Sequence, residues 1–392
     1  MHSLPEKYIK ERERTEMAYG FEQVIAQQDV KAHLLQMVRE NQLPHALMFC
    51  GPQGAGKLPL ALAFARYLLC SEPGEEDACG QCTGCRMLEG WAHPDLHFSF
   101  PVYKGKSSDH PVSDNYLEPW RKQVQENPYF DTEMWLNDIK AENQQITFYV
   151  QESDALQRKL ALKSSQGGRK VVLMWLPEKM SQEVANKLLK LIEEPPLHTC
   201  FLLVSEDPEM VLGTIQSRVQ RINVPALTEE EIAQALMTLH AVPEELARNI
   251  AHISRGNYTE ALKRLEAGNE QQQFFELFKQ LMRSSYIRDL KDLQQWTLQV
   301  KELGRERQKR LLEYFQRLIR ENFIYNFHQA EMSFQTQEEQ QFSQKFAPFI
   351  NEINVIGIMD ELSDAQRDIE QNVNAQMVFF DFALKMIILL KR

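Results

Sequence analysis

The stretch GPQGAGKL, residues 51–58, decides the fold of this chain. It has the spacing of a phosphate-binding P-loop, G-x-x-x-x-G-K, between an apolar run at 46–50 and a helical pattern at 60–69. A strand, a glycine-rich loop and a helix in this order let backbone N–H groups surround a phosphate at the helix N-terminus. We therefore predict an α/β domain with a parallel sheet and flanking helices. Its candidate nucleotide-binding residues are Gly51, Gly54, Gly56 and Lys57.

Positions that ATP hydrolysis needs carry apolar residues. Leu58 stands where a P-loop ATPase has a Ser or Thr whose hydroxyl binds Mg²⁺. Trp175 and Leu176 end the apolar run at 170–176, where an Asp and a Glu would bind Mg²⁺ and polarise the attacking water. Glu178 is the nearest carboxylate, and we expect it to be a solvent-exposed residue at a helix start. ATP or ADP can still be held at the loop, but we expect no hydrolysis.

The composition is that of a globular protein of two or three domains. The chain has 392 residues and a formal net charge of −11, so it is poorly suited to wrapping DNA by itself, because phosphate neutralisation needs clustered Lys and Arg. We expect no membrane-spanning helix, since no run of about eighteen uncharged apolar residues occurs. We expect residues 1–20 to form a charged N-terminal extension rather than a secretion signal, and the protein to be cytoplasmic.

Four of the six cysteines cluster in residues 70–85 and predict a metal site. Cys70, Cys79, Cys82 and Cys85 combine two C-x-x-C steps with a fourth cysteine upstream, a ligand pattern that suits one tetrahedral Zn²⁺. The alternative is a set of buried or redox-active thiols. Because the cluster has few basic neighbours, we expect a structural zinc module rather than a DNA-reading finger.

Residues 101–145 read as an insertion. They are rich in Pro, Ser, Asp, Asn and Lys, and a helical or strand period is not sustained over most of the segment. We predict a partly ordered loop. The alternative is that the aromatic residues of the segment pack on a neighbouring surface; these residues are Trp120, Tyr129, Phe130 and Trp135.

Several short motifs follow one another in an order that resembles the clamp-loader AAA+ family. They are HAL at 45–47, the P-loop, the four-cysteine cluster, ANKLLK at 185–190, LIEEPP at 191–196 and TIQSR at 214–218. The resemblance covers about residues 21–225, and the L-x-E-E-P-P and S-R elements are quite specific. The chain beyond this range matches the family in length and helical character.

The resemblance implies a domain organisation and a set of partners. Residues 21–225 would form the AAA+ P-loop domain with the zinc module, residues 226–268 a small helical lid, and residues 269–392 an all-α collar for oligomerisation. The partners would be gamma or tau ATPase subunits and a delta subunit in a hetero-pentameric ring of DNA polymerase III. Through that complex the chain would act on a sliding clamp and on primer–template DNA.

The resemblance also implies roles for single residues. The family contains ATPases and a member that does not hydrolyse ATP. Thr259 stands where the ATPases carry an Arg that senses the γ-phosphate, which is a further departure from their pattern. Arg218 matches the arginine that the family presents to the ATP of a neighbouring subunit, an arginine finger. The alternative for Arg218 is a surface salt bridge, and the nearby Arg221 is the residue most easily confused with it.

Three functions from different classes are compatible with this sequence. The first is a ring subunit that does not hydrolyse ATP and supplies Arg218 to a neighbour in trans. The second is an active AAA+ ATPase of the gamma or tau kind, with unusual Mg²⁺ coordination. The third is a zinc-dependent DNA-binding module.

Overall fold

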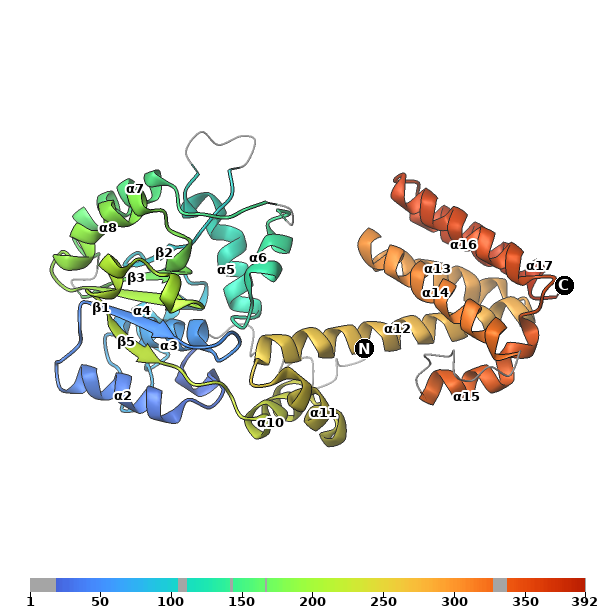
Figure 1. Ribbon diagram of the computed structural model, residues 1–392, viewed down its shortest axis with the longest axis horizontal. Coiled ribbons are helices and arrows are strands. Elements are labelled where there is room, and N and C mark those ends of the chain that lie inside the picture. The colour runs from blue at the N-terminus through green and yellow to red at the C-terminus, as the bar shows by residue number, and fades with distance from the viewer. Residues whose placement is uncertain (1–18, 105–110, 142–143, 166–167, 327–336, 392) are drawn as a thin grey trace. The chain divides into compact units, whose positions relative to one another are not determined.

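The computed structural model describes residues 19–104, 111–141, 144–165, 168–326 and 337–391. The chain forms two compact units, Met1–Arg264 and Leu265–Arg392 (Figure 1). Residues 1–18 of the predicted N-terminal extension lie outside the described residues, as do residues 105–110 and 142–143 of the predicted insertion. The predicted division into a domain at 21–225, a lid at 226–268 and a collar at 269–392 stays a prediction.

The first unit is built on a parallel sheet (Figure 1). Its strands are β1 (Ala46–Cys50), β2 (Leu96–Ser99), β3 (Lys170–Trp175), β4 (Thr199–Ser205) and β5 (Gln220–Asn223). They lie in the order β2-β3-β4-β1-β5, and every pair is parallel. Strands β1, β3 and β4 are buried along their whole length, which is why their sequences are continuous apolar runs. The predicted parallel α/β fold is confirmed.

Helices cover both faces of this sheet. The helices of the whole unit are α2 (Gln28–Arg39), α3 (Lys57–Leu69), α4 (Thr83–Glu89), α5 (Leu117–Glu126), α6 (Thr132–Asp138), α7 (Val150–Ala161), α8 (Gln182–Glu193), α9 (Gly213–Gln216), α10 (Glu229–His240) and α11 (Glu244–Ser254). Short 3-10 helices are η1 (Phe21–Gln23), η2 (Ser113–Tyr116), η3 (Pro177–Lys179) and η4 (Pro208–Met210). Alternate residues of β1 point to opposite faces: Leu47 and Phe49 join the apolar cluster that contains α3, whereas Met48 joins the cluster that contains α7 and α8.

The predicted insertion, residues 101–145, is folded in its described part, and the prediction of a partly ordered loop is wrong there. The segment contains η2, α5 and α6, and its Trp120 and Trp135 are fully buried. The Trp120 ring stacks on Phe100 at a centroid distance of 4.2 Å and lies 5.3 Å from the ring of Trp175. Because each such ring buries about 150–250 Å², aromatic packing on the sheet stabilises short helices that show little period of their own.

The second unit is helical in its described part. Its helices are α13 (Leu290–Glu302), α14 (Arg305–Tyr325), α15 (Gln337–Phe346), η6 (Ala347–Phe349), α16 (Val355–Glu370) and α17 (Ala375–Leu389), and α12 (Tyr258–Ile287) begins in the first unit and ends here. Trp296 is a fully buried residue of the core and donates a hydrogen bond of 2.9 Å to the carbonyl of Leu277. The predicted all-α character of this part is therefore confirmed.

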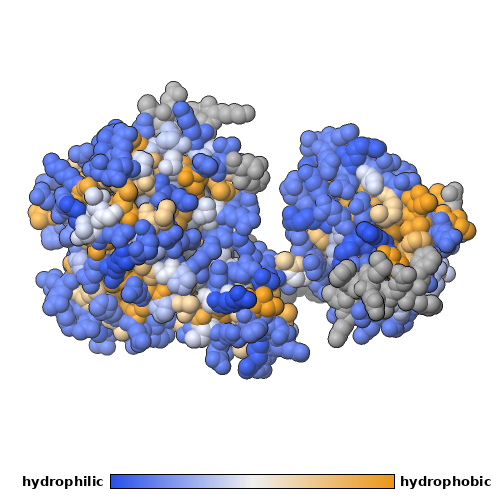
Figure 2. Space-filling view, in the orientation of Figure 1, coloured by the Kyte–Doolittle hydropathy of each residue, from blue (hydrophilic) through white to orange (hydrophobic). Residues whose placement is uncertain are grey.

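The surface of both units is mainly hydrophilic on the face shown in Figure 2, with an apolar area on the second unit. Ile287, Leu290 and Ile388 are among the exposed apolar residues of that unit. Among the described residues, no helix combines the length and the apolar character needed to cross a membrane.

Candidate functional site

The predicted P-loop residues come together as a loop between β1 and α3. Gly54 and Gly56 have φ angles of +71° and +89°, in the left-handed region that glycine adopts without strain. Gly56 caps the N-terminus of α3, which begins at Lys57. A Cβ atom on Gly51 would lie 2.1 Å from the carbonyl oxygen of Val224, so the backbone of the unit approaches the loop too closely for a side chain.

Side chains of the same unit pack directly on this loop. The N–H of Tyr258, at the start of α12, donates a hydrogen bond of 3.2 Å to the Gly54 carbonyl. A Cβ atom on Gly54 would lie 1.9 Å from Oδ1 of Asn257, and one on Gly56 would lie 3.2 Å from the ring of Tyr129. The rings of Tyr129 and Tyr258 meet edge to face with centroids 4.9 Å apart, and both are buried. The glycines of the loop therefore face side chains of their own chain.

Asp131 ties the loop to the start of the long helix α12. Its carboxylate caps α6 by accepting the N–H of Met134 at 3.0 Å. It also accepts a hydrogen bond of 3.4 Å from Nε2 of Gln53 in the P-loop and forms an ion pair of 2.7 Å with Lys263 of α12. One side chain of the predicted insertion thus holds two elements of the candidate nucleotide site.

Lys57 points at the loop that carries it. Its Nζ donates hydrogen bonds of 2.8 Å to the carbonyl of Gly51 and 2.6 Å to that of Pro52, and the residue is 5% exposed. Burial lowers the pKa of the Lys57 ammonium, although the carboxylates of Glu206 and Glu178 act in the opposite direction. The ammonium that would bind a phosphate is therefore hydrogen-bonded to backbone carbonyls.

The prediction that Glu178 is solvent-exposed is wrong. The residue is half-buried in η3, not solvent-exposed, and its carboxylate accepts hydrogen bonds from Ser205 Oγ at 2.9 Å, the N–H of Glu206 at 2.9 Å and the N–H of Asp207 at 3.2 Å. These partners lie 27 to 29 residues away in the chain, so sequence reasoning could not find them. Glu178 fixes the backbone that follows β4.

Arg218 lies between α9 and β5 with its side chain 35% exposed. Its Nε forms an ion pair with Glu193, and its Nη1 donates hydrogen bonds of 2.8 Å to the Thr214 carbonyl and 3.0 Å to Ser217 Oγ. The residue lines a cavity of about 680 Å³. The other lining residues are Pro44, His45, Ala46, Glu193, Ser217, Val219 and Gln220.

Arg218 and Lys57 lie at opposite edges of the sheet. Lys57 follows the carboxyl end of β1, whereas Arg218 precedes the amino end of β5, which runs parallel to β1 and pairs with it from Leu47 to Cys50. The five residues of β1 separate the two edges by roughly 16 Å at about 3.3 Å per residue. Arg218 therefore faces away from the P-loop of its own chain.

Arg221 occupies a different place from Arg218. It lies on β5, forms an ion pair of 3.3 Å with Glu209 and donates a hydrogen bond to Oε1 of Gln216. It is not among the residues that line the cavity beside Arg218. The structure thus distinguishes the two arginines by their surroundings, which the sequence does not show.

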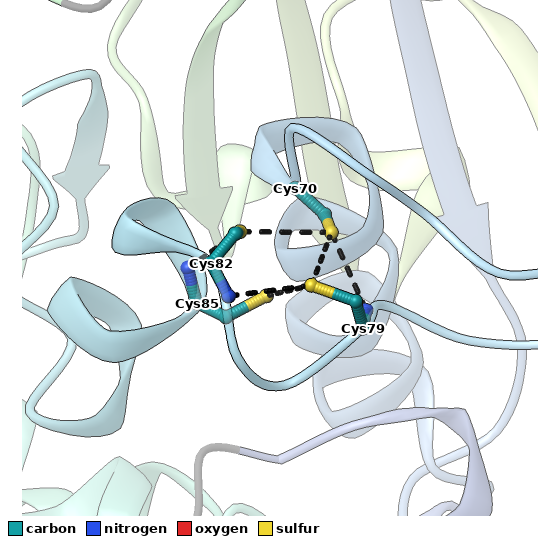
Figure 3. Close-up of side chains that lie close together, drawn as sticks. All are labelled: Cys70, Cys79, Cys82 and Cys85. Carbon is teal, nitrogen blue, oxygen red and sulfur yellow. Dashed lines mark hydrogen bonds between the residues drawn. The ribbon is translucent and has the colours of Figure 1, made fainter.

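The four predicted metal ligands come together at the end of α3 and the start of α4 (Figure 3). All Sγ atoms lie within 4.8 Å of one another; Sγ of Cys70 is 3.5 Å from that of Cys79 and 3.8 Å from that of Cys82, and Cys79 and Cys85 are 3.9 Å apart. Zn–S bonds of about 2.3 Å in a tetrahedron would place the sulfurs about 3.8 Å apart. The cluster could hold a metal ion, and its dimensions suit zinc.

Backbone N–H groups prepare these sulfurs for a cation. The N–H of Cys79 donates to Sγ of Cys70 at 3.3 Å, that of Cys82 to Cys79 at 3.4 Å, and that of Cys85 to Cys82 at 3.4 Å. Although burial acts in the other direction, hydrogen bonds from Ser71 and from the N–H of Cys85 lower the pKa of the Cys82 thiol to about 5. A thiolate is the form that binds metal, so these hydrogen bonds favour the ligand state at Cys82, whereas burial raises the pKa of the Cys70 and Cys85 thiols.

The structure adds contacts that the sequence did not predict. Tyr129 and Asp131 lie more than seventy positions after the P-loop that they contact. The sequence marks Tyr129 only as an aromatic residue of the insertion, and it does not mark Asp131. Glu193 belongs to the quoted L-x-E-E-P-P element, but only the fold brings it to Arg218. A long-range contact of this kind has no signal in a single sequence.

The strand order, the P-loop between β1 and α3, and helices on both faces of the sheet define a P-loop protein of the AAA+ class. Residues 26–228 match the model of a family described as DNA polymerase III, delta subunit. The chain belongs to this family. The predicted family resemblance is confirmed.

Individual relatives agree with the family. The chain is 32% identical over 199 residues to DNA polymerase III subunit delta' of Pseudomonas aeruginosa, a match that covers 50% of this chain and 48% of the relative. It is 27% identical over 230 residues to subunit delta' of Bacillus subtilis, with 59% and 56% covered. The match thus spans about half the length of these curated relatives.

A solved structure is also similar, at a lower level. It is a DNA polymerase III gamma subunit-related protein of Thermotoga maritima, with 14% identity, 92% of this chain and 99% of that chain covered, and a TM-score of 0.35. A likeness at this score carries no weight for function.

Proposed function

We propose that this chain is the delta-prime, or stator, subunit of the DNA polymerase III clamp loader. It would assemble with gamma or tau ATPase subunits and a delta subunit into a hetero-pentamer in the cytoplasm. Within that assembly it would help to load the sliding clamp at primer–template DNA during replication. Membership of the family and the likeness to two proteins named delta' support this proposal.

In this proposal the chain does not hydrolyse ATP but supplies Arg218 in trans to the ATP of a neighbouring subunit. The observation that carries the proposal is the contrast between the two edges of one sheet. Two of the three N–H donors of Lys57 are taken by carbonyls of its own loop, whereas Arg218 lines an open cavity at the other edge. An always-charged planar guanidinium suits the charge of a transferring phosphoryl group.

The absence of hydrolysis follows from the residues at the P-loop edge. Leu58, Trp175 and Leu176 are buried apolar side chains at positions where a Mg²⁺ ligand or a water-activating carboxylate is needed. Thr259 is also buried, at the start of α12, where the resemblance to the clamp-loader ATPases implies an arginine sensor. Removing these electrostatic contributions together removes most of the catalysis of phosphoryl transfer.

The four cysteines contribute to this function through stability. They join the end of α3, which begins at the P-loop, to α4. A Zn²⁺ held by Cys70, Cys79, Cys82 and Cys85 would supply folding free energy to this corner of the domain, with no part in the chemistry of ATP.

Co-purification tests the proposal directly. The full chain is expressed with clamp-loader ATPase and delta subunits, and we expect it to enter a stable assembly with them. The isolated chain is expected to show no ATP turnover at any protein concentration. Turnover by the isolated chain that scales with its concentration would support an active ATPase instead, and salt-dependent binding of duplex DNA by the isolated chain would support the zinc-dependent DNA-binding function.

A further inference from the structure

The guanidinium of Arg218 is held by two of its three nitrogens. Its Nε pairs with the carboxylate of Glu193, and its Nη1 is used by Thr214 and Ser217. Its Nη2 makes no hydrogen bond within the part of the chain that the structure describes. The group is therefore oriented, and Nη2 is left to donate to another molecule.

Glu193 is itself fixed in place by the local backbone. It is the last residue of α8, and Glu194 follows as the C-cap with its N–H bonded to the carbonyl of Lys190 at 3.0 Å. Pro195 and Pro196 come next, and prolines restrict the backbone and cannot continue the helix. The carboxylate thus projects from a rigid helix end into the same cavity that Arg218 lines.

We propose that Glu193 is a positioning residue for Arg218: it holds the guanidinium through Nε so that Nη2 is presented to the phosphate of a neighbouring subunit. This inference rests on the proposed function. The pair carries no net charge, so Glu193 contributes orientation rather than attraction for phosphate. Catalysis by a preorganised donor depends on its placement before the reaction, which is the property that a fixed carboxylate supplies.

Stability measurements alone cannot test this role. Glu193 and Arg218 have side chains that are 41% and 35% exposed, and an exposed ion pair of this kind stabilises a protein by about 0–1 kcal/mol. The test is therefore kinetic and uses the full chain in the assembly with its ATPase and delta subunits. The variants are Glu193→Ala, Glu193→Gln, Arg218→Ala and the double variant, and Glu194→Ala is the matched control because Glu194 is exposed.

Glu193→Ala is expected to lower kcat at the site beside this chain about 10-fold while KM for ATP changes by less than about twofold, because a misplaced group affects the chemical step. Glu193→Gln is expected to keep most of the rate, since its amide oxygen can still accept from Nε. The double variant is expected to equal Arg218→Ala, because Glu193 acts through that residue. Glu194→Ala is expected to match the unmodified assembly.

Two results would overturn the inference. One is a Glu193→Ala rate equal to or above that of the unmodified assembly while Arg218→Ala lowers the rate, which leaves the trans role of Arg218 standing. The other is an equal fall for Glu193→Ala in the presence and absence of Arg218, which would mean that Glu193 acts independently. Unchanged turnover with Arg218→Ala would instead overturn the proposed trans role, and the positioning role with it.

Discussion

Lys57 and Arg218 lie at opposite ends of the same parallel sheet, and their surroundings differ. Lys57 is 5% exposed, and the two hydrogen bonds of its ammonium go to carbonyls of its own loop. Arg218 has a side chain that is 35% exposed and lines a cavity of about 680 Å³. A buried, hydrogen-bonded group must break its bonds before it can meet a partner, whereas a partly exposed group with a nitrogen still unbonded can meet one with less rearrangement.

The difference comes from what each edge packs against. Tyr129, Asp131 and Tyr258 reach the P-loop at the carboxyl edge of the sheet. At the amino edge, Arg218 is held by Glu193 and by the turn that precedes β5. The P-loop is therefore covered at one edge of the sheet, whereas Arg218 stays accessible at the other edge. The predictions below test this contrast.

Loss of the metal site is expected to have the largest effect on stability, and to act mainly on the P-loop edge of the sheet. Cys82→Ser should lower zinc content and stability together, because structural Zn²⁺ contributes about 10–16 kcal/mol of binding free energy in small zinc peptides. Since α3 runs from Lys57 to the cysteine cluster, hydrogen exchange should rise in α3 and α4 before it rises at residues 213–223. Zinc content by atomic absorption, thermal unfolding and exchange mass spectrometry measure these effects.

Cys200→Ala is the control for the metal prediction. Cys200 is a buried cysteine of β4 that does not belong to the cluster, so its replacement should leave the zinc content unchanged. Full stability of the Cys82→Ser chain without metal would contradict a structural metal site. The cysteine cluster would then not stabilise the P-loop edge of the sheet.

Arg218→Ala is expected to leave folding intact and to lower ATP turnover of the reconstituted assembly. The site beside this chain should lose about 10³-fold in rate, the lower end of what an arginine finger contributes. The unfolding midpoint should change little, because the side chain is partly exposed and its ion pair is weak in water. Steady-state turnover of the assembly, with Arg221→Ala as the matched arginine control, is the measurement. An equal loss of turnover with Arg221→Ala would mean that the effect is not specific to Arg218, and would contradict its assignment as the arginine finger.

Tyr129→Ala is expected to destabilise the first unit by about 3 kcal/mol, because a buried aromatic ring leaves a cavity against the P-loop. Tyr129→Phe removes the hydroxyl that accepts the N–H of Ile25 at 2.9 Å and should cost about 1 kcal/mol. Urea unfolding of the three proteins gives these values.

ATP with Mg²⁺ should not raise the urea midpoint of the unmodified chain. A rise would mean that the P-loop still binds nucleotide, and the two edges of the sheet would then not differ in accessibility.

The sequence predicts the scaffold well and the surroundings of the site poorly. Apolar runs and the glycine spacing suffice for the parallel sheet and the P-loop, because these signals are local. The cysteine spacing brings four sulfurs together for the same reason. The packing of Tyr129 on Gly56, the capping of the β4 loop by Glu178 and the pairing of Glu193 with Arg218 join residues from 25 to 73 positions apart or depend on folded helices. They could not be predicted from periodicity, since no local pattern encodes them.

Lys57→Met gives the smallest expected effect and tests the closed edge by its pH dependence. Burial lowers the pKa of Lys57 in the folded chain below its ordinary value of 10.5, so between the lowered pKa and about 10.5 the unfolded chain holds a proton that the folded chain has lost. The free energy of unfolding of the unmodified chain, relative to Lys57→Met, should therefore rise with pH across that window and level off above it. The control is Lys163→Met, which makes the same substitution at an exposed lysine. A flat difference for Lys57→Met would mean that the ammonium is as well solvated in the folded chain as in water, and the P-loop edge would then be as open as the edge of Arg218.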